Sequence, residues 1–174
     1  GSPGIGNGVG VYCDKWLTLL KDLIVTENNQ DQGGDGSGIY SIQGNVTIEN
    51  VSVTNNTGYF GAIGILNGST ATLNGVTISD NVNSQWGGGI YINGSVVNIY
   101  ESQITNNSAG HGGGIYLSSG NLDITNTNIS NNTATSGGGG GICSIGGRLN
   151  LENVQITDNS TLNSGGGIFA QTIL

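Results

Sequence analysis

The sequence predicts an all-β chain that winds as a parallel β-helix, a solenoid of about six coils with three short strands in each. Segments of 25 to 28 residues recur along the chain, and a repeat of that length is typical of solenoids. Each segment carries three short β-branched or aliphatic runs separated by Gly or Asn. The 174 residues also include 34 Gly and one Pro, which favours regular tight turns over an ordinary packed globule.

The repeated segments align with one another almost without gaps. Three that align without a gap are GIYINGSVVNIYESQITNN (89–107), GIYLSSGNLDITNTNISNN (114–132) and GICSIGGRLNLENVQITDN (141–159). GIYSIQGNVTIENVSVTNN (38–56) joins them, and GILNGSTATLNGVTISDN (64–81) does so with one deletion. We therefore expect one domain over residues 1–174, with coils that begin near residues 10, 38, 64, 89, 114 and 141 and a partial coil from 167.

The first unit is ambiguous, because Trp16, Leu19, Leu20 and Leu23 have the spacing of an amphipathic helix. The repeat gives a different answer for the same stretch. Counted from Gly10, the positions that the repeat requires are filled by Leu20, Val25, Thr26, Glu27 and Asn28. We therefore predict a first coil with a larger excursion at residues 15–17, and a capping helix remains the alternative.

Stacked coils place like residues over one another, because a unit this small cannot bury its own apolar face and must pack on its neighbours. The alignment gives three apolar columns. The first contains Val11, Ile39, Ile65, Ile90, Ile115, Ile142 and Ile168. The second contains Leu20, Ile48, Leu73, Ile99, Ile124 and Leu151, and the third contains Val25, Val53, Ile78, Ile104, Ile129 and Ile156.

One further column consists only of asparagine. Its members are Asn28, Asn56, Asn81, Asn107, Asn132 and Asn159. Asn tolerates the left-handed backbone conformation that a sharp bend requires. Stacked side-chain amides can also hydrogen-bond along the axis. We therefore assign this column a structural role.

A hydroxyl column flanks the third apolar column and is a candidate binding surface. It contains Thr26, Thr54, Ser79, Thr105, Ser130 and Thr157. The residues two positions earlier are mixed, and from the second coil on they are Ser52, Thr77, Gln103, Asn128 and Gln155. Such an array can order water at an ice surface or bind sugar hydroxyls, although strands that face water favour Thr in any case.

A largely aromatic column lies next to the first apolar column. It contains Tyr12, Tyr40, Leu66, Tyr91, Tyr116, Cys143 and Phe169. If the isoleucines point inward, strand alternation turns this column outward. Tyr40, Tyr91 and Tyr116 would then form an exposed ladder that stacks on glycans or on a neighbouring rod. If the corner glycines reverse the alternation, the column belongs to the core, and the sequence leaves both alternatives open.

Charge and hydropathy exclude several functions. The formal net charge is −8, and the only basic side chains are Lys15, Lys21 and Arg148. We therefore expect no nucleic acid partner. Anionic membranes are disfavoured for the same reason. No apolar run approaches the roughly 18 residues of a membrane span, so we expect no membrane insertion.

The chain offers no recognisable catalytic constellation, so we predict a protein that is not an enzyme and has no cofactor. Its carboxylates are scattered, and Asp80 and Asp158 lie three coils apart, or roughly 14 Å at the strand spacing. The loop at residues 28–38 contains Asp31, Asp35 and Ser37, but their spacing does not match an EF-hand, so we expect a polar loop and no metal site.

The two cysteines are expected to be free thiols. Cys13 and Cys143 belong to coils five repeats apart, which corresponds to about 24 Å at the strand spacing. The Cα atoms of a disulfide lie within roughly 7 Å of each other. The two side chains therefore cannot pair within one rod.

The stretches ITNNSAGHGGGIY and ISNNTATSGGGGGI resemble the Asn-x-(Ser/Thr)-Ala…Gly-Gly-Gly-Ile units of right-handed parallel β-helix repeat proteins. These include surface proteins of the polymorphic outer-membrane-protein type and adhesin-like proteins. The resemblance covers about residues 10–170. It implies a right-handed helix and an extracellular or cell-surface location.

We therefore expect a non-enzymatic structural or adhesive segment. Its expected partners are a glycan, ice or host-surface ligand, or further copies stacked end to end into a fibre through unpaired strands at the ends. An ice-binding or carbohydrate-binding solenoid is the alternative, and a polysaccharide lyase is a more distant one.

Overall fold

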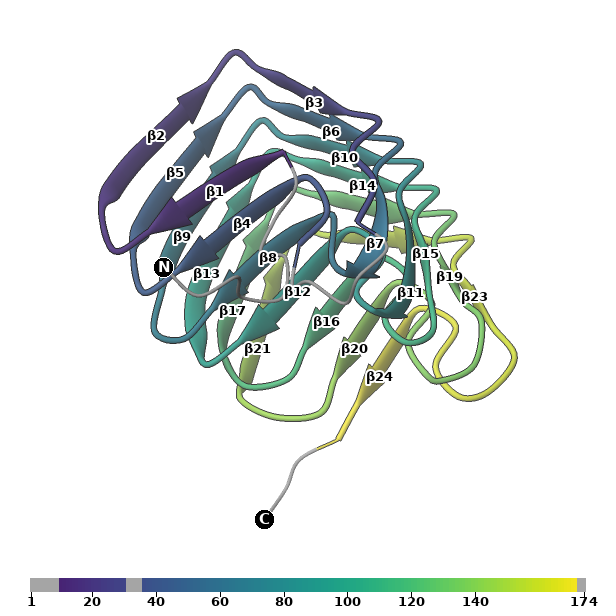
Figure 1. Cartoon of the computed structure of the whole chain (residues 1–174). Coiled ribbons are helices and arrows are strands. Elements are labelled where there is room, and N and C mark those ends of the chain that lie inside the picture. Colours follow the sequence, from purple (N-terminus) through teal and green to yellow (C-terminus); the bar gives the residue numbers. More distant parts are fainter. Residues whose placement is uncertain (1–9, 31–35, 172–174) are drawn as a thin grey trace.

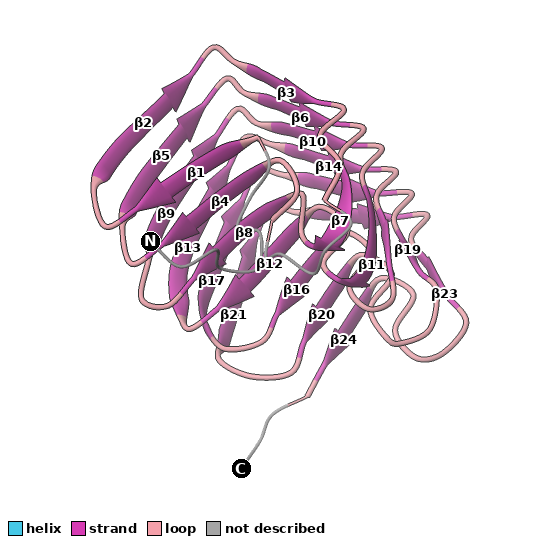
Figure 2. Ribbon diagram, viewed as in Figure 1, coloured by secondary structure: helices cyan, strands magenta, loops and turns pink. Residues whose placement is uncertain are grey.

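The computed structural model describes residues 10–30 and 36–171. The described chain is a right-handed parallel β-helix that contains strands and no helix (Figure 1). The coils wind through four walls, which are parallel sheets that we name A, B, C and D (Figure 2), and the described part of the first coil has strands in A, B and C. The all-β parallel solenoid predicted from the repeat is therefore confirmed.

Sheets A and B form two long neighbouring walls. Sheet A consists of β1 (Val11–Asp14), β4 (Ile39–Ile42), β8 (Ile63–Leu66), β12 (Ile90–Asn93), β16 (Ile115–Leu117), β20 (Ile142–Ser144) and β24 (Ile168–Ala170). Sheet B consists of β2 (Leu17–Lys21), β5 (Asn45–Glu49), β9 (Thr70–Asn74), β13 (Ser95–Tyr100), β17 (Gly120–Thr125) and β21 (Arg148–Glu152).

Sheets C and D complete each coil. Sheet C consists of β3 (Ile24–Thr26), β6 (Ser52–Thr54), β10 (Thr77–Ser79), β14 (Gln103–Thr105), β18 (Asn128–Ser130) and β22 (Gln155–Thr157). Sheet D consists of β7 (Thr57–Phe60), β11 (Val82–Trp86), β15 (Ser108–Ala109), β19 (Thr133–Ala134) and β23 (Ser160–Thr161). Sheet D adds a fourth short strand to the three expected in the second to sixth coils, because part of the connection after the asparagine column is itself extended there.

The predicted second and third apolar columns are in register, strand by strand, along sheets B and C. The first column needs one correction, because Ile63 and not Ile65 pairs with Ile39 and Ile90. Both isoleucines are buried. Since they are two residues apart, they face the same side of the strand, and this allowed the alignment to slip. The third coil therefore begins near residue 62, two residues before the predicted start at Gly64.

The first coil is a regular coil and not a capping helix. Strands β1, β2 and β3 pair with β4, β5 and β6 at a constant offset of 28 residues, from Val11 opposite Ile39 to Thr26 opposite Thr54. The excursion predicted at residues 15–17 is therefore absent. Lys15, with a φ of 61°, turns the chain sharply between β1 and β2 instead.

The asparagine column forms a continuous hydrogen-bonded ladder, as predicted. In each step the backbone N–H and the side-chain Nδ2 of one asparagine donate to Oδ1 of the asparagine in the next coil, at 2.8 to 3.1 Å. From Asn56 onward, Nδ2 also donates to a backbone carbonyl of the preceding coil, as from Asn107 to Ile78 at 2.9 Å. The ladder thus satisfies backbone groups that the corner would otherwise bury without partners.

The left-handed residue at this corner is not the ladder asparagine, which corrects the reason given for that column. It is the residue immediately before it, with φ between 54° and 58° in every coil. These residues are Glu27, Asn55, Asp80, Asn106, Asn131 and Asp158. The side chain of the ladder asparagine must point inward to reach the next coil. The exposed residue before it therefore adopts the left-handed conformation that bends the chain at this corner.

Candidate functional site

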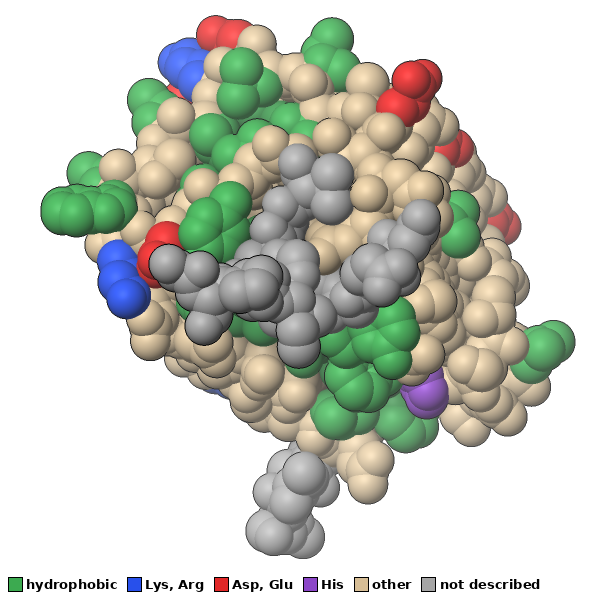
Figure 3. Space-filling view, in the orientation of Figure 1, with side chains coloured by type: hydrophobic (Ala, Val, Ile, Leu, Met, Phe, Trp, Pro, Cys, Tyr) green, Lys and Arg blue, Asp and Glu red, His purple; other side chains and the backbone are tan. Residues whose placement is uncertain are grey.

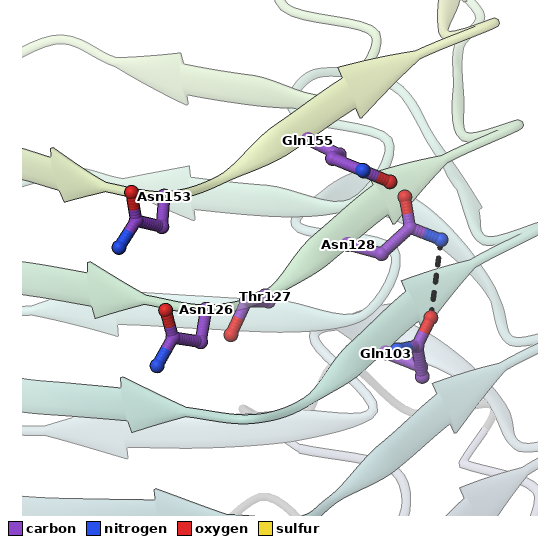
Figure 4. A pocket seen from close by; sticks show the side chains of 6 residues that line it. All are labelled: Gln103, Asn126, Thr127, Asn128, Asn153 and Gln155. Carbon is purple, nitrogen blue, oxygen red and sulfur yellow. Dashed lines mark hydrogen bonds between the residues drawn. The ribbon is translucent and has the colours of Figure 1, made fainter.

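A groove lined mainly by side-chain amides crosses the corner between sheets B and C. It has a volume of about 320 Å³ and is lined by Gln103, Asn126, Thr127, Asn128, Asn153 and Gln155. In Figure 4 the amides from β14, β18 and β22 lie on one side, and Asn126 and Asn153 lie on the other. The groove therefore spans three successive coils.

The backbone positions the two sides of the groove differently. Gln103, Asn128 and Gln155 are register partners on adjacent strands of sheet C, and strand alternation turns all three outward. Asn126 and Asn153 occupy the turns before β18 and β22, where their φ values are 50° and 52°. Asn is favoured there because its short polar side chain tolerates the left-handed conformation.

The groove offers neutral hydrogen-bonding groups and no charged side chain among its lining residues. Nδ2 of Asn128 donates to Oε1 of Gln103 at 3.1 Å and to Oγ of Ser130 at 3.1 Å. Each primary amide supplies two N–H donors and one carbonyl acceptor. Such a surface suits a ligand rich in hydroxyl groups, since a hydroxyl both donates and accepts.

Sequence reasoning identified one side of the groove and missed the other. The alignment already gave the residues on the sheet C side, Gln103, Asn128 and Gln155, as outward residues two positions before the hydroxyl column. Asn126 and Asn153 were not singled out, although an Asx residue also fills the same corner at Asp22 and Asn50. The recurrence of Asx before the third strand of a coil was the available signal.

The hydroxyl column stands in register along sheet C, as predicted from the alignment. In the first two coils the hydroxyls of this column contact each other, since Oγ1 of Thr54 donates to Oγ1 of Thr26 at 3.2 Å. Ser130 is buried, however, and the neighbouring outward column begins with the exposed Ile24. The fully hydroxylated two-column surface that would order water is therefore not formed.

The tyrosine column does not form an exposed ladder. Tyr40, Tyr91 and Tyr116 are only 2%, 6% and 6% exposed. Strand alternation does turn them away from the main core, but residues at the ends of sheet D strands cover them. Phe60 of β7 stacks on Tyr91 with ring centroids 5.1 Å apart, and Trp86 of β11 stacks on Tyr116 at 5.6 Å. These tyrosines therefore pack in a second apolar cluster outside sheet A and are not available to stack on a glycan.

The register within this column also differs from the prediction, because Gly64 and not Leu66 pairs with Tyr40 and Tyr91. Leu66 nevertheless joins the same cluster, together with Cys143. Only Tyr12, at the end of the column, is substantially exposed.

The second cluster should make the protein sensitive to alkali. Burial raises the pKa of Tyr116 to about 12, and Cys143 and Tyr91 add to the shift. An unfolded tyrosine titrates near pH 10, so between about pH 10 and 12 only the unfolded state loses this proton. We expect the free energy of unfolding to fall by about 1–3 kcal/mol over that interval, measured by urea unfolding at each pH. Tyr116→Phe is the control and should show a smaller fall, whereas an equal fall would exclude Tyr116 as its source.

Both cysteines are free thiols, as predicted, and both are buried. Among residues 10–30 and 36–171, no group of three or more His, Cys, Asp or Glu side chains is placed to hold a metal ion. Asp31 and Asp35 of the loop considered above lie outside the described residues, and Ser37 is buried.

Two of the three basic side chains form ion pairs. Nζ of Lys21 lies 3.1 Å from Glu49, and the Arg148 guanidinium lies 2.8 Å from Asp123. Both pairs join neighbouring strands on the outer face of sheet B. No helix in the described part of the chain is long and apolar enough to cross a membrane.

Comparison with protein families agrees with this geometry. A family model described as a right-handed β-helix region matches residues 7–172, so the chain belongs to this family. Searches of curated proteins and of solved structures gave no match. Because one fold serves many functions, the activity of this member has to be argued from its own surface.

Proposed function

We propose that this β-helix is a non-enzymatic, adhesive segment of an extracellular or cell-surface protein, and that its amide-lined groove binds a neutral polysaccharide. The observation that carries the proposal is the groove itself, in which amides from three coils converge without a charged side chain. An uncharged, hydroxyl-rich polymer matches this lining, and the overall net charge of −8 disfavours an acidic one.

The rod supplies the geometry for such binding. Neighbouring coils are separated by about 4.8 Å, so amides in one column recur at that interval along the axis. An extended polymer lying along the groove would meet one sheet C amide in each of three successive coils, from Gln103, Asn128 and Gln155. Repeated weak contacts on a rigid support then add without a large ordering cost for the protein.

The test is a screen on immobilised neutral and acidic glycans, followed by titration of the strongest neutral ligand. We expect Asn128→Ala and Asn153→Ala each to weaken binding about tenfold, since each removes an amide worth roughly 1–1.5 kcal/mol. Thr77→Ala and Asn50→Ala are matched controls, because they occupy the same two columns outside the groove and should leave binding unchanged.

Two results would contradict this proposal. Binding that is equally sensitive to the control substitutions would place the ligand elsewhere. Release of unsaturated or reducing sugar products during incubation with the bound polysaccharide would show an enzyme, in line with the lyases that share β-helical architecture.

A further inference from the structure

The amide-lined groove has two sides and a floor, and each offers a ligand different groups. One side, which we call the strand rail, consists of the sheet C amides Gln103, Asn128 and Gln155. The other side, the turn rail, consists of Asn126 and Asn153. Thr127 lies between the two rails and is 2% exposed (Figure 4).

Charge gives the groove no attraction for an acidic ligand. Glu101 occupies the same corner as Asn126 one coil earlier, and Glu152 directly precedes Asn153. On the face drawn in Figure 3, acidic side chains are likewise scattered among neutral groups. A polymer that carries carboxylates or sulfates is therefore repelled, and the choice among neutral polymers depends on shape and hydrogen bonding.

The floor of the groove offers no free hydroxyl at Thr127. This hydroxyl donates to the Thr125 carbonyl at 3.0 Å and accepts from the Ser102 N–H at 3.3 Å. A glucose-type pyranose ring has the complementary arrangement, because its hydroxyls are equatorial and lie at its edges while axial C–H bonds cover its faces. Such a ring fits the groove when it lies flat over Thr127 with its edges toward the two rails.

The strand rail alternates in length and in hydrogen-bonding capacity. The side chains of Gln103 and Gln155 are one methylene longer than that of Asn128 between them. Nδ2 of Asn128 donates both to Oε1 of Gln103 and to Oγ of Ser130, each at 3.1 Å. Asn128 therefore offers a ligand its Oδ1 acceptor, whereas Gln103 offers the N–H donors of its Nε2.

A β-1,4-linked glucan matches this alternation. Its linkages leave each ring through equatorial bonds at opposite ends, so the chain is straight and each residue advances by nearly the coil separation of about 4.8 Å. Successive rings are turned over, so that one edge of the chain presents ring hydroxyls and a CH₂OH group in turn. An α-1,4-linked glucan curves away from a straight rail, because one bond of each linkage is axial.

We propose, on the basis of the polysaccharide binding proposed above, that the groove binds three successive residues of an extended β-1,4-linked glucan. Each residue lies beside one amide of the strand rail. The CH₂OH group of the middle residue projects toward Asn128 and donates to its Oδ1, while ring hydroxyls of the flanking residues meet the longer glutamines. Asn128 is thus a specificity-determining residue, because its short side chain leaves room for the CH₂OH group.

Titration calorimetry with cello-oligosaccharides of two to six residues tests the length of the site. We expect the affinity to rise about tenfold from the disaccharide to the trisaccharide, which engages one more amide, and by less than about threefold beyond it. Malto-oligosaccharides are the α-1,4-linked isomers of the same lengths. We expect maltotriose to bind at least about tenfold more weakly than cellotriose.

The variant Asn128→Gln tests the place of the CH₂OH group, because it keeps the amide but lengthens the side chain. We expect the affinity for cellotriose to fall about tenfold. Xylotriose, whose residues lack the CH₂OH group, should bind this variant and the unsubstituted protein with affinities equal within about twofold. Asn121→Gln, the same exchange at an exposed position of β17, is the matched control and should leave both affinities unchanged. Circular dichroism spectra must show that both variants are folded.

Two results would overturn this ligand while leaving the groove as a polysaccharide site. The first is maltotriose, or a neutral glycan of another linkage, that binds at least as tightly as cellotriose and is lost with Asn128→Ala and Asn153→Ala. The second is an equal loss of cellotriose and xylotriose binding with Asn128→Gln. If no neutral glycan bound at all, the polysaccharide-binding function itself would fail, and this ligand with it.

Discussion

Replacement of Asn107 by alanine is expected to lower the free energy of unfolding by about 3–5 kcal/mol. The side chain makes four hydrogen bonds in the middle of the asparagine ladder. Nδ2 donates to the Ile78 carbonyl and to Oδ1 of Asn132, and Oδ1 accepts from N–H and Nδ2 of Asn81. Alanine removes the acceptor of the buried Asn81 N–H and one of the hydrogen bonds to the Ile78 carbonyl.

The measurement is equilibrium urea unfolding followed by circular dichroism. Asn121→Ala is the control, because Asn121 is exposed on β17 and should change stability by less than about 0.5 kcal/mol. If the two variants lost equal stability, the ladder would contribute no more than an ordinary surface amide. A repeat solenoid can also unfold in parts. The unfolding transitions of the two variants should therefore each be followed by more than one probe.

The second large effect is expected at Gly113, where alanine should cost more than about 3 kcal/mol or prevent folding. A Cβ atom at this position would lie 2.5 Å from the Gly140 carbonyl oxygen and 2.5 Å from backbone atoms of Thr133. Both neighbours are backbone atoms of the next coil, so they cannot move aside unless the stacking changes.

Gly94→Ala separates crowding from conformational strain. Gly94 has a φ of 64°, but a Cβ atom there would have nothing within 4 Å. We expect Gly94→Ala to lower the free energy of unfolding by about 1–2 kcal/mol, which is the usual cost of the left-handed conformation for alanine. Thermal unfolding of the two variants gives the comparison, and equal losses would exclude close approach of the coils as the reason for glycine at position 113.

The fold could be predicted from the sequence because every coil of a solenoid has the same pattern of residues. Each column is sampled six or more times, so the asparagine ladder and the second and third apolar columns stand out despite variation in single coils. The same redundancy assigned the first coil correctly, although the spacing of Trp16, Leu19, Leu20 and Leu23 fits a helix. The slip at Ile63 and Ile65 shows the limit, since two inward residues of one strand are equivalent to any pattern with a period of two.

The candidate site was less accessible, because it depends on residues in the turns. The columns on strands were correctly expected to face outward at Gln103, Asn128 and Gln155. Whether an outward side chain meets solvent depends on what the connections do. Tyr91 and Tyr116 face away from the main core, yet Phe60 and Trp86 from the ends of sheet D strands cover them.

The sequence by itself determined the winding, the identity of the stacked columns and the separation of the two cysteines, because these follow from a repeat length and from strand alternation. Only the tertiary structure decided which outward residues are exposed, which corner residue takes the left-handed conformation, and where a groove forms. The physical reason is that periodicity fixes the side of a strand on which a residue lies, while solvent exposure depends on contacts between coils and connecting segments that no single repeat encodes.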